Sequence, residues 1–178
     1  NSLSKGRFSD MGSNFENLPS TDKGRGMSKA YKEAVAVFQT EIKTRKVVVD
    51  VTERGIIVSL SADAYFRPGS AELDIDQARS VLEKLAALST KTDFKDKNVR
   101  IEGHTDSTGT DPNGPWPTNW KLSSARSLSV LDYLIDFGAD PSHFSVVGYG
   151  EYQPIFPNDT EEHRSKNRRV DIVILRSK

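Results

Sequence analysis

The sequence predicts an α/β sandwich in which helices pack on one face of a mixed β-sheet, with an amphipathic helix before it. Stretches of helical periodicity alternate with short β-branched runs, and turn residues separate them. No repeat of roughly 20 to 50 residues, the period of solenoids and propellers, is visible. A chain of 178 residues is long enough for one well-buried core plus an appended segment.

The N-terminal part is predicted to hold an arm followed by a helix. Residues 1–26 are rich in Ser, Gly, Asn and Lys, which is typical of a flexible arm. Over residues 27–45, apolar side chains recur at steps of three or four and form one helical stripe. The stripe consists of Met27, Tyr31, Ala34, Phe38 and Ile42. Its spacing leaves open whether the same domain or a partner chain covers it.

The remaining residues, 46–178, are predicted to form the main domain. Two β-branched runs, at 47–51 and 56–60, flank Glu53-Arg54-Gly55 and indicate a hairpin. A helix is expected over 75–89 after an N-cap at Asp74. A short strand around 99–101 then leads into a Pro- and Gly-rich loop.

The C-terminal half continues this alternation. A helix is expected from about Leu122 to Phe137, with Ala125, Leu128, Leu131 and Ile135 facing inward and Gly138 ending it. A strand over 144–147 and a short helix from Thr160 come next. The last strand, 170–175, is almost wholly apolar, which predicts a central position in the sheet.

Composition excludes several classes of function. The 25 basic and 25 acidic residues cancel, so the chain lacks the net positive charge typical of nucleic-acid binders. Without cysteine, the chain has no disulfide, thiolate zinc site or cysteine nucleophile. It also lacks a run of roughly 18 apolar residues and a signal-peptide pattern. Because residue 1 is Asn, we expect a fragment or a processed form.

Polar residues at the end of one strand and the start of the next helix indicate a ligand site. His104, Thr105 and Asp106 follow the strand at 99–101, and Asn119, Ser123 and Arg126 lie at the helix start. Asp106 and Arg126 form either a simple ion pair or a clamp on a zwitterion. In the clamp, the arginine grips a carboxylate and the aspartate accepts from an ammonium. Spacing does not decide between these alternatives.

Other chemistry is less well supported by the sequence. His104 has no second histidine at metal-ligand spacing, so no metal or cofactor is expected. A hydrolase built from Ser123, His104 and Asp106 would lack the Gly-x-Ser-x-Gly elbow. Trp116 and Trp120 either stack on a sugar or peptide or seal the loop. A basic cluster could indicate RNA binding, but at zero net charge it is interpreted as a solvated helix end next to the site. The cluster consists of Arg164, Lys166, Arg168 and Arg169.

Several separated motifs resemble those of the OmpA-like peptidoglycan-binding domain over residues 47–176. They occur in the family's order along the chain. They are Phe66 with Gly69-Ser70-Ala71, Gly103-His104-Thr105-Asp106, Asn119 with Leu122-Ser123 and Arg126, Gly148-Tyr149-Gly150 with Pro154 and Asn158, and Asn167-Arg168-Arg169-Val170. The resemblance implies a non-enzymatic module with this α/β fold that binds peptidoglycan non-covalently.

The resemblance also implies site residues. Asp106 and Arg126 match the pair that holds diaminopimelate in the stem peptide. Positions lining the same pocket match Thr105, Asn119, Leu122 and Arg169. Many members have an acidic residue where this chain has Arg67, so that wall of the pocket is expected to differ.

Within the family, residues 66–71 and 116–123 look most like the flagellar stator subunit MotB. This likeness implies a periplasmic homodimer that anchors the motor to the cell wall. It also implies a MotA-like partner, reached through an N-terminal inner-membrane helix absent here. Residues 1–45 would then be plug or linker. The alternatives are a general OmpA- or Pal-type envelope tether and a peptidoglycan hydrolase.

Overall fold

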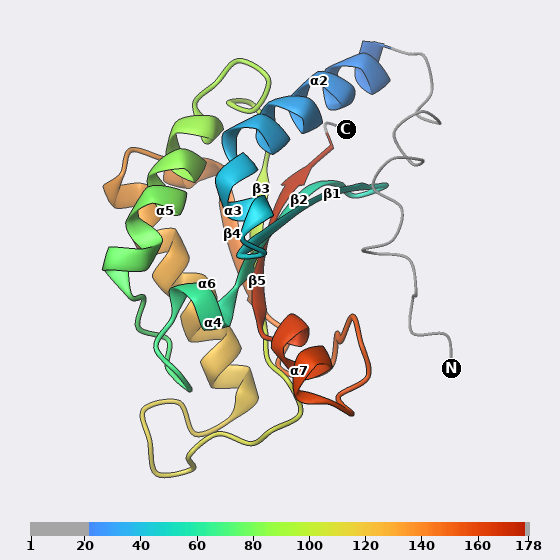
Figure 1. Cartoon of the computed structure of the whole chain (residues 1–178). Coiled ribbons are helices and arrows are strands. Elements are labelled where there is room, and N and C mark those ends of the chain that lie inside the picture. The colour runs from blue at the N-terminus through green and yellow to red at the C-terminus, as the bar shows by residue number, and fades with distance from the viewer. Residues whose placement is uncertain (1–21, 177–178) are drawn as a thin grey trace.

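Five strands form one mixed sheet in the computed structural model, which describes residues 22–176 (Figure 1). The strand order is β1-β2-β5-β3-β4, and only the β3–β4 pair is parallel. The strands are β1 (Val47–Thr52), β2 (Gly55–Ser61), β3 (Val99–His104), β4 (Phe144–Gly148) and β5 (Arg169–Leu175). The predicted mixed sheet is confirmed, and its apolar last strand lies at the centre.

Helices cover one face of this sheet, as predicted. Figure 1 shows α5 and α6 side by side against the strands, while α7 stands apart beside one end of β5. The helices are α2 (Asp22–Val37), α3 (Gln39–Lys43), α4 (Ala62–Tyr65), α5 (Ile75–Ser89), α6 (Asn119–Asp136) and α7 (Glu161–Asn167). A 3-10 turn, η1 (Pro141–His143), precedes β4.

The N-terminal helix belongs to the domain core. Met27, Ala30, Ala34 and Phe38 are buried in the same apolar cluster as the inner side chains of β1 and β2. The same domain therefore covers the stripe within this chain. The helix starts at Asp22, earlier than expected, and is broken at Phe38 between α2 and α3. Residues 1–21 of the predicted arm lie outside the described residues.

The inward face predicted for α6 is wrong at two of its four residues, while Leu131 packs against the core and Ala125 is half-buried. Leu128 and Ile135 are 47% and 36% exposed, whereas Ser123, Ser127 and Val130 are fully buried. Ser123 and Ser127 therefore share the buried face of α6 with Leu122, Val130 and Leu134, and the serines lie where the helix comes closest to the sheet.

Two glycines in the sheet explain why small side chains lie on the buried face of α6. A Cβ on Gly103 would overlap the carbonyl oxygen of Ser123, and one on Gly148 would overlap Ser124. The α6 backbone thus lies directly on β3 and β4, closer than branched or long side chains allow. Ser127 fits there by donating a 2.9 Å hydrogen bond to the Val147 carbonyl. This close contact fixes α6 against the end of β3, where the candidate site lies.

Candidate functional site

The loop after β3 is tied to the start of α6, as the sequence predicts. Asn119 Nδ2 donates to the carbonyls of Asp106 (3.3 Å) and Thr108 (3.2 Å). The Asp106 side chain turns back, and its Oδ1 accepts from the Thr108 N–H at 2.8 Å. Buried Thr105 donates from its hydroxyl to the Asp106 carbonyl at 2.9 Å. The bonds from Asn119 and Thr105 fix the Asp106 backbone, and the bond from Thr108 orients its carboxylate.

Asp106 pairs with Arg168, which follows α7. Its Oδ2 accepts from Arg168 Nη1 at 2.6 Å. Arg168 also donates to both carboxylate oxygens of Asp63, at 3.0 and 2.9 Å, and to Glu161. The Asp63 hydrogen bonds, followed by those from Glu161 and Asp106, raise the pKa of Arg168 against the opposing effect of burial. The basic helix end does lie next to the site, but Arg168 is held by three carboxylates and does not extend into solvent as expected.

Arg126 is buried without a carboxylate partner. Only 3% of the residue is exposed, and its Nε donates to the Ser70 carbonyl at 2.9 Å. Its guanidinium lies over the Phe66 ring, 5.4 Å from the centroid. Within residues 22–176 it has no other hydrogen bond and no ion pair. The Asp106–Arg126 ion pair considered from the sequence is thus not formed, and the two Nη groups can serve another acceptor.

Burial dominates the electrostatics of Arg126. Burial is the largest cause: it is opposed by the carboxylates of Asp63 and Asp106 and reinforced by the charge of Arg168, and the net effect lowers the pKa of Arg126 to about 10. A buried cation is costly unless it is paired. A ligand carboxylate would complete the pair and could accept both Nη groups in a bidentate fork.

The position of Arg126 in its helix differs from the prediction. Thr118 caps α6 by accepting from the Lys121 N–H at 3.2 Å, so the helix starts at Asn119 and not near Leu122. Arg126 therefore lies beyond the first turn, where the helix dipole has little effect. Leu122, predicted to line the pocket, is buried at the second turn of α6.

Arg169 is not among the residues around Asp106. Its Nε donates to Asp171 at 3.1 Å, and its Nη groups donate to the carbonyls of Asn167 (3.2 Å) and Gln153 (3.1 Å). Val170 points into the core, so the alternation of β5 places Arg169 and Asp171 on the opposite face of the sheet. Arg168 stands beside Asp106 in its place.

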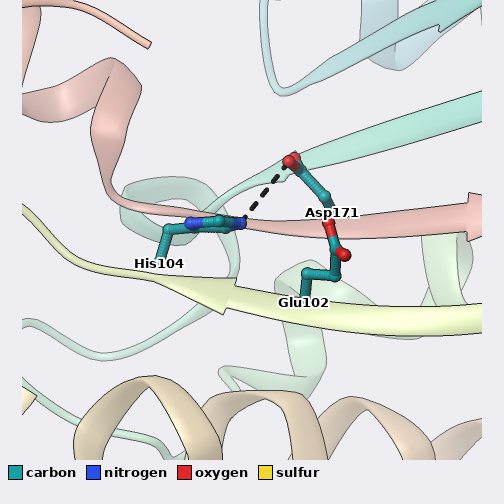
Figure 2. Close-up of side chains that lie close together, drawn as sticks. All are labelled: Glu102, His104 and Asp171. Carbon is teal, nitrogen blue, oxygen red and sulfur yellow. Dashed lines mark ion pairs between the residues drawn. The ribbon is translucent and has the colours of Figure 1, made fainter. Parts of the chain in front are cut away.

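That opposite face carries a second polar cluster, shown in Figure 2. Glu102 and His104 on β3 and Asp171 on β5 converge, with potential ligand atoms within 4.8 Å of one another. They line a cavity of about 280 Å³ together with Tyr149, whose ring stacks on His104 at 5.2 Å. Of these three residues, the sequence patterns indicate only His104 as a candidate. They miss Glu102 and Asp171 because the register of β3 against β5, and not their distance along the chain, brings them opposite each other.

The cluster does not resemble an open metal centre. Glu102 pairs with Arg54 and, at 3.3 Å, with Arg100, while Asp171 pairs with Arg169 at 3.1 Å. Three guanidinium groups therefore surround two carboxylates, and a divalent cation would have to displace them. His104 Nε2 lies 3.7 Å from Asp171.

The residues of the hydrolase considered from the sequence have other partners. Ser123 Oγ donates to the Trp120 carbonyl at 3.2 Å and accepts from the Gly150 N–H at 3.0 Å. His104 faces Asp171, and Asp106 binds Arg168. The three side chains therefore do not form a catalytic triad in this structure.

Comparison with known proteins identifies the family. The family model described as "OmpA family" matches residues 65–168, which cover β3, α6, β4, α7 and the loop after β3. The chain belongs to the OmpA family. Similar curated proteins include motility protein B of Bacillus subtilis, which is 33% identical over 129 residues, or 70% of this chain and 47% of that protein. Peptidoglycan-binding protein ArfA of Mycobacterium tuberculosis is 43% identical over 79 residues, 44% of this chain and 23% of ArfA.

Solved structures extend the likeness beyond the matched segment. A MotB-like protein from Desulfovibrio vulgaris superposes with a TM-score of 0.78 at 30% identity and covers 86% of this chain and 93% of that one. The cell wall anchor of the T6SS from Pseudomonas aeruginosa gives 0.70 at 28% identity, covering 80% and 96%. The chain spans about half the length of the first curated relatives it matches. Among the described helices, none combines the length and apolarity needed to cross a membrane.

Proposed function

We propose that this OmpA-family domain binds peptidoglycan non-covalently and that Asp106 and Arg126 hold the diaminopimelate residue of its stem peptide. The observation that carries the proposal is Arg126, a buried cation whose Nη groups have no acceptor among the residues that the structure describes, within electrostatic reach of Asp106. ArfA is named a peptidoglycan-binding protein, and the Pseudomonas aeruginosa neighbour is a cell wall anchor. Both names agree with this chemistry.

The charges of the site match a zwitterion. Diaminopimelate carries a carboxylate and an ammonium at the end of its side chain. Arg126 would bind the carboxylate through its two Nη groups, and Asp106 would accept from the ammonium through lone pairs that Arg168 and Thr108 leave unused. Thr105 and Asn119 would act by orienting Asp106.

The site also suggests how it tolerates Arg67. That side chain is exposed and lies 3.8 Å from Glu72, so it does not enter the Asp106–Arg126 region. Asp63 on α4 is the carboxylate with the largest effect on Arg126, where it raises the pKa. We infer that Asp63 replaces the acidic residue expected at position 67.

For the whole protein, we propose anchoring of a flagellar motor stator to the cell wall. This would place the domain in the periplasm as a homodimer, with a MotA-like partner and an inner-membrane anchor. Similarity to MotB-type chains over most of the domain supports this role. The second candidate is a general envelope tether, favoured by the similarity to the T6SS anchor. Chromosomal Arg126→Ala should leave flagella assembled but cells paralysed, whereas normal swimming would contradict the stator role.

Co-sedimentation with diaminopimelate-containing sacculi tests the binding site. We expect Asp106→Ala and Arg126→Ala each to weaken binding by about tenfold or more, because each leaves one ligand charge unpaired. Asp111→Ala and Arg79→Ala are matched controls, since both side chains are exposed and should bind like the wild type. Unchanged binding by both site variants would overturn the assignment. Release of soluble muropeptides in the same tubes would indicate a hydrolase instead.

A further inference from the structure

Two aromatic rings are stacked on the surface next to the candidate site. Trp120 on α6 is 52% exposed and Tyr152 is 62% exposed, yet their centroids are 5.1 Å apart with an interplanar angle of 23°. Single exposed aromatics are ordinary on protein surfaces. Here, segments distant in sequence bring two of them together, and no apolar core covers them.

The backbone at Gly150 holds this pair in place. Gly150 has a positive φ of 60°, and a Cβ there would lie 3.5 Å from the Trp120 ring and 3.6 Å from Tyr152. Its N–H donates to Ser123 Oγ at 3.0 Å, and its carbonyl accepts from the Thr105 N–H at 2.9 Å. The two rings therefore rest on backbone that is itself bonded to α6 and to the loop carrying Asp106.

Hydrogen bonds link the candidate site to the residues next to the aromatic pair in the chain. Asn119, which binds the Asp106 carbonyl, also donates to the Glu151 carboxylate at 3.1 Å. Trp120 directly follows Asn119, and Tyr152 directly follows Glu151. A polymer whose peptide branch reaches Asp106 and Arg126 would thus pass its backbone within reach of these rings.

We propose that Trp120 and Tyr152 form a platform on which a sugar ring of the glycan strand stacks. This rests on the proposed function, because it assigns the second component of the same polymer to a second surface. The flat apolar faces suit the C–H face of a pyranose. Exposed Lys121 and half-buried Glu151 border the rings and can hydrogen-bond to hydroxyl and acetamido groups. A polar rim around flat rings favours a sugar over an apolar peptide, which would need a groove.

Tryptophan fluorescence offers a direct test, because the chain has only two tryptophans. In a Trp116→Phe background, peptide-free chains of N-acetylglucosamine and N-acetylmuramic acid should change the emission of Trp120. Trp120→Ala and Tyr152→Ala should weaken glycan binding by roughly three- to tenfold and leave affinity for the free stem peptide unchanged. Tyr152→Phe, which keeps the ring, should retain binding. Leu128→Ala, another exposed apolar site on α6, is the matched control.

The outcomes separate this platform from the proposed function. We expect Arg126→Ala to lose affinity for the stem peptide and keep glycan binding, whereas Trp120→Ala and Tyr152→Ala keep their affinity for the peptide. This result would support two independent contacts, one for the peptide and one for the glycan. If Arg126→Ala leaves the affinity for the stem peptide unchanged, the peptide clamp is overturned. The platform still stands in that case, provided that the protein binds peptide-free glycan. No fluorescence change with peptide-free glycan would overturn the platform. A loss of peptide affinity in Trp120→Ala would also overturn it and assign the rings to the stem peptide.

Discussion

Arg168 donates a 2.6 Å hydrogen bond to Asp106, whereas Arg126 has no carboxylate partner among residues 22–176. Arg168 simultaneously binds Asp63, so one guanidinium links α4, the loop after β3 and the end of α7. The arrangement orients Asp106 and keeps an unsatisfied cation nearby. Under the proposed function, a zwitterionic ligand would pair with both Asp106 and Arg126.

The uncompensated charge of Arg126 predicts an unusual stability effect. Arg126→Met keeps the contact with Phe66 but removes a cation that folding desolvates. We expect the free energy of unfolding to stay within about 1 kcal/mol of the wild type or to rise by up to about 2 kcal/mol. Urea denaturation measures this. A loss of more than about 3 kcal/mol would mean that Arg126 is already paired within the domain.

Removing Arg168 should have the opposite effect. Arg168→Ala leaves Asp106, which is buried, and Asp63 without their shared cation. We expect the free energy of unfolding to fall by about 2 kcal/mol or more. Arg164→Ala is the matched control, since Arg164 pairs at 3.3 Å with a largely exposed Glu161 and should change stability by less than about 0.5 kcal/mol. Equal effects of the two substitutions would refute a special role for Arg168.

The pH dependence of stability should report the Arg168–Glu161 contact. The hydrogen bond and charge of Arg168 hold the pKa of Glu161 below its ordinary value of 4.5. The stabilising contribution is therefore complete above that value and is lost as the pH falls through the lower pKa of the folded state. Unfolding curves of wild type and Glu161→Gln should differ by a constant amount near neutral pH and converge on acidification. Parallel curves down to about pH 3 would contradict this contact.

The close approach of α6 to β3 predicts that Gly103 does not tolerate a side chain. Gly103→Ala would push a methyl group into the Ser123 carbonyl, and we expect a loss of about 3 kcal/mol as the helix moves outward. Gly109→Ala is the control, because nothing lies within 4 Å of a Cβ there. Thermal unfolding compares the two. If Gly103→Ala is as stable as Gly109→Ala, the backbone contact is looser than described.

Local signals account for much of what the sequence predicts correctly. The hairpin at β1 and β2 and the helix α5 follow from side-chain periodicity and turn residues, which act over a few positions. The buried face of α6 is different, because it depends on glycines in β3 and β4. Serine at a buried position looks polar in a single sequence, whereas a leucine such as Leu128 looks inward.

The site shows the same limit. The strand-end rule places Asp106 next to Asn119 correctly, since both flank one loop. Arg168 and Arg169 are adjacent in the chain, yet one meets Asp106 and the other meets Asp171 on the opposite sheet face. A one-residue difference at a strand start inverts which side chain faces the site. No spacing pattern distinguishes them without the register of β5.

The most direct test of the central claim compares two stem peptides that differ in one group. A lysine-containing peptide keeps the side-chain ammonium but lacks the second carboxylate of diaminopimelate. By isothermal titration calorimetry, the wild type should prefer the diaminopimelate peptide by about tenfold or more, because only that peptide supplies an acceptor for Arg126. Arg126→Met should bind both peptides equally weakly. An unchanged preference in Arg126→Met would contradict the assignment of the carboxylate to Arg126.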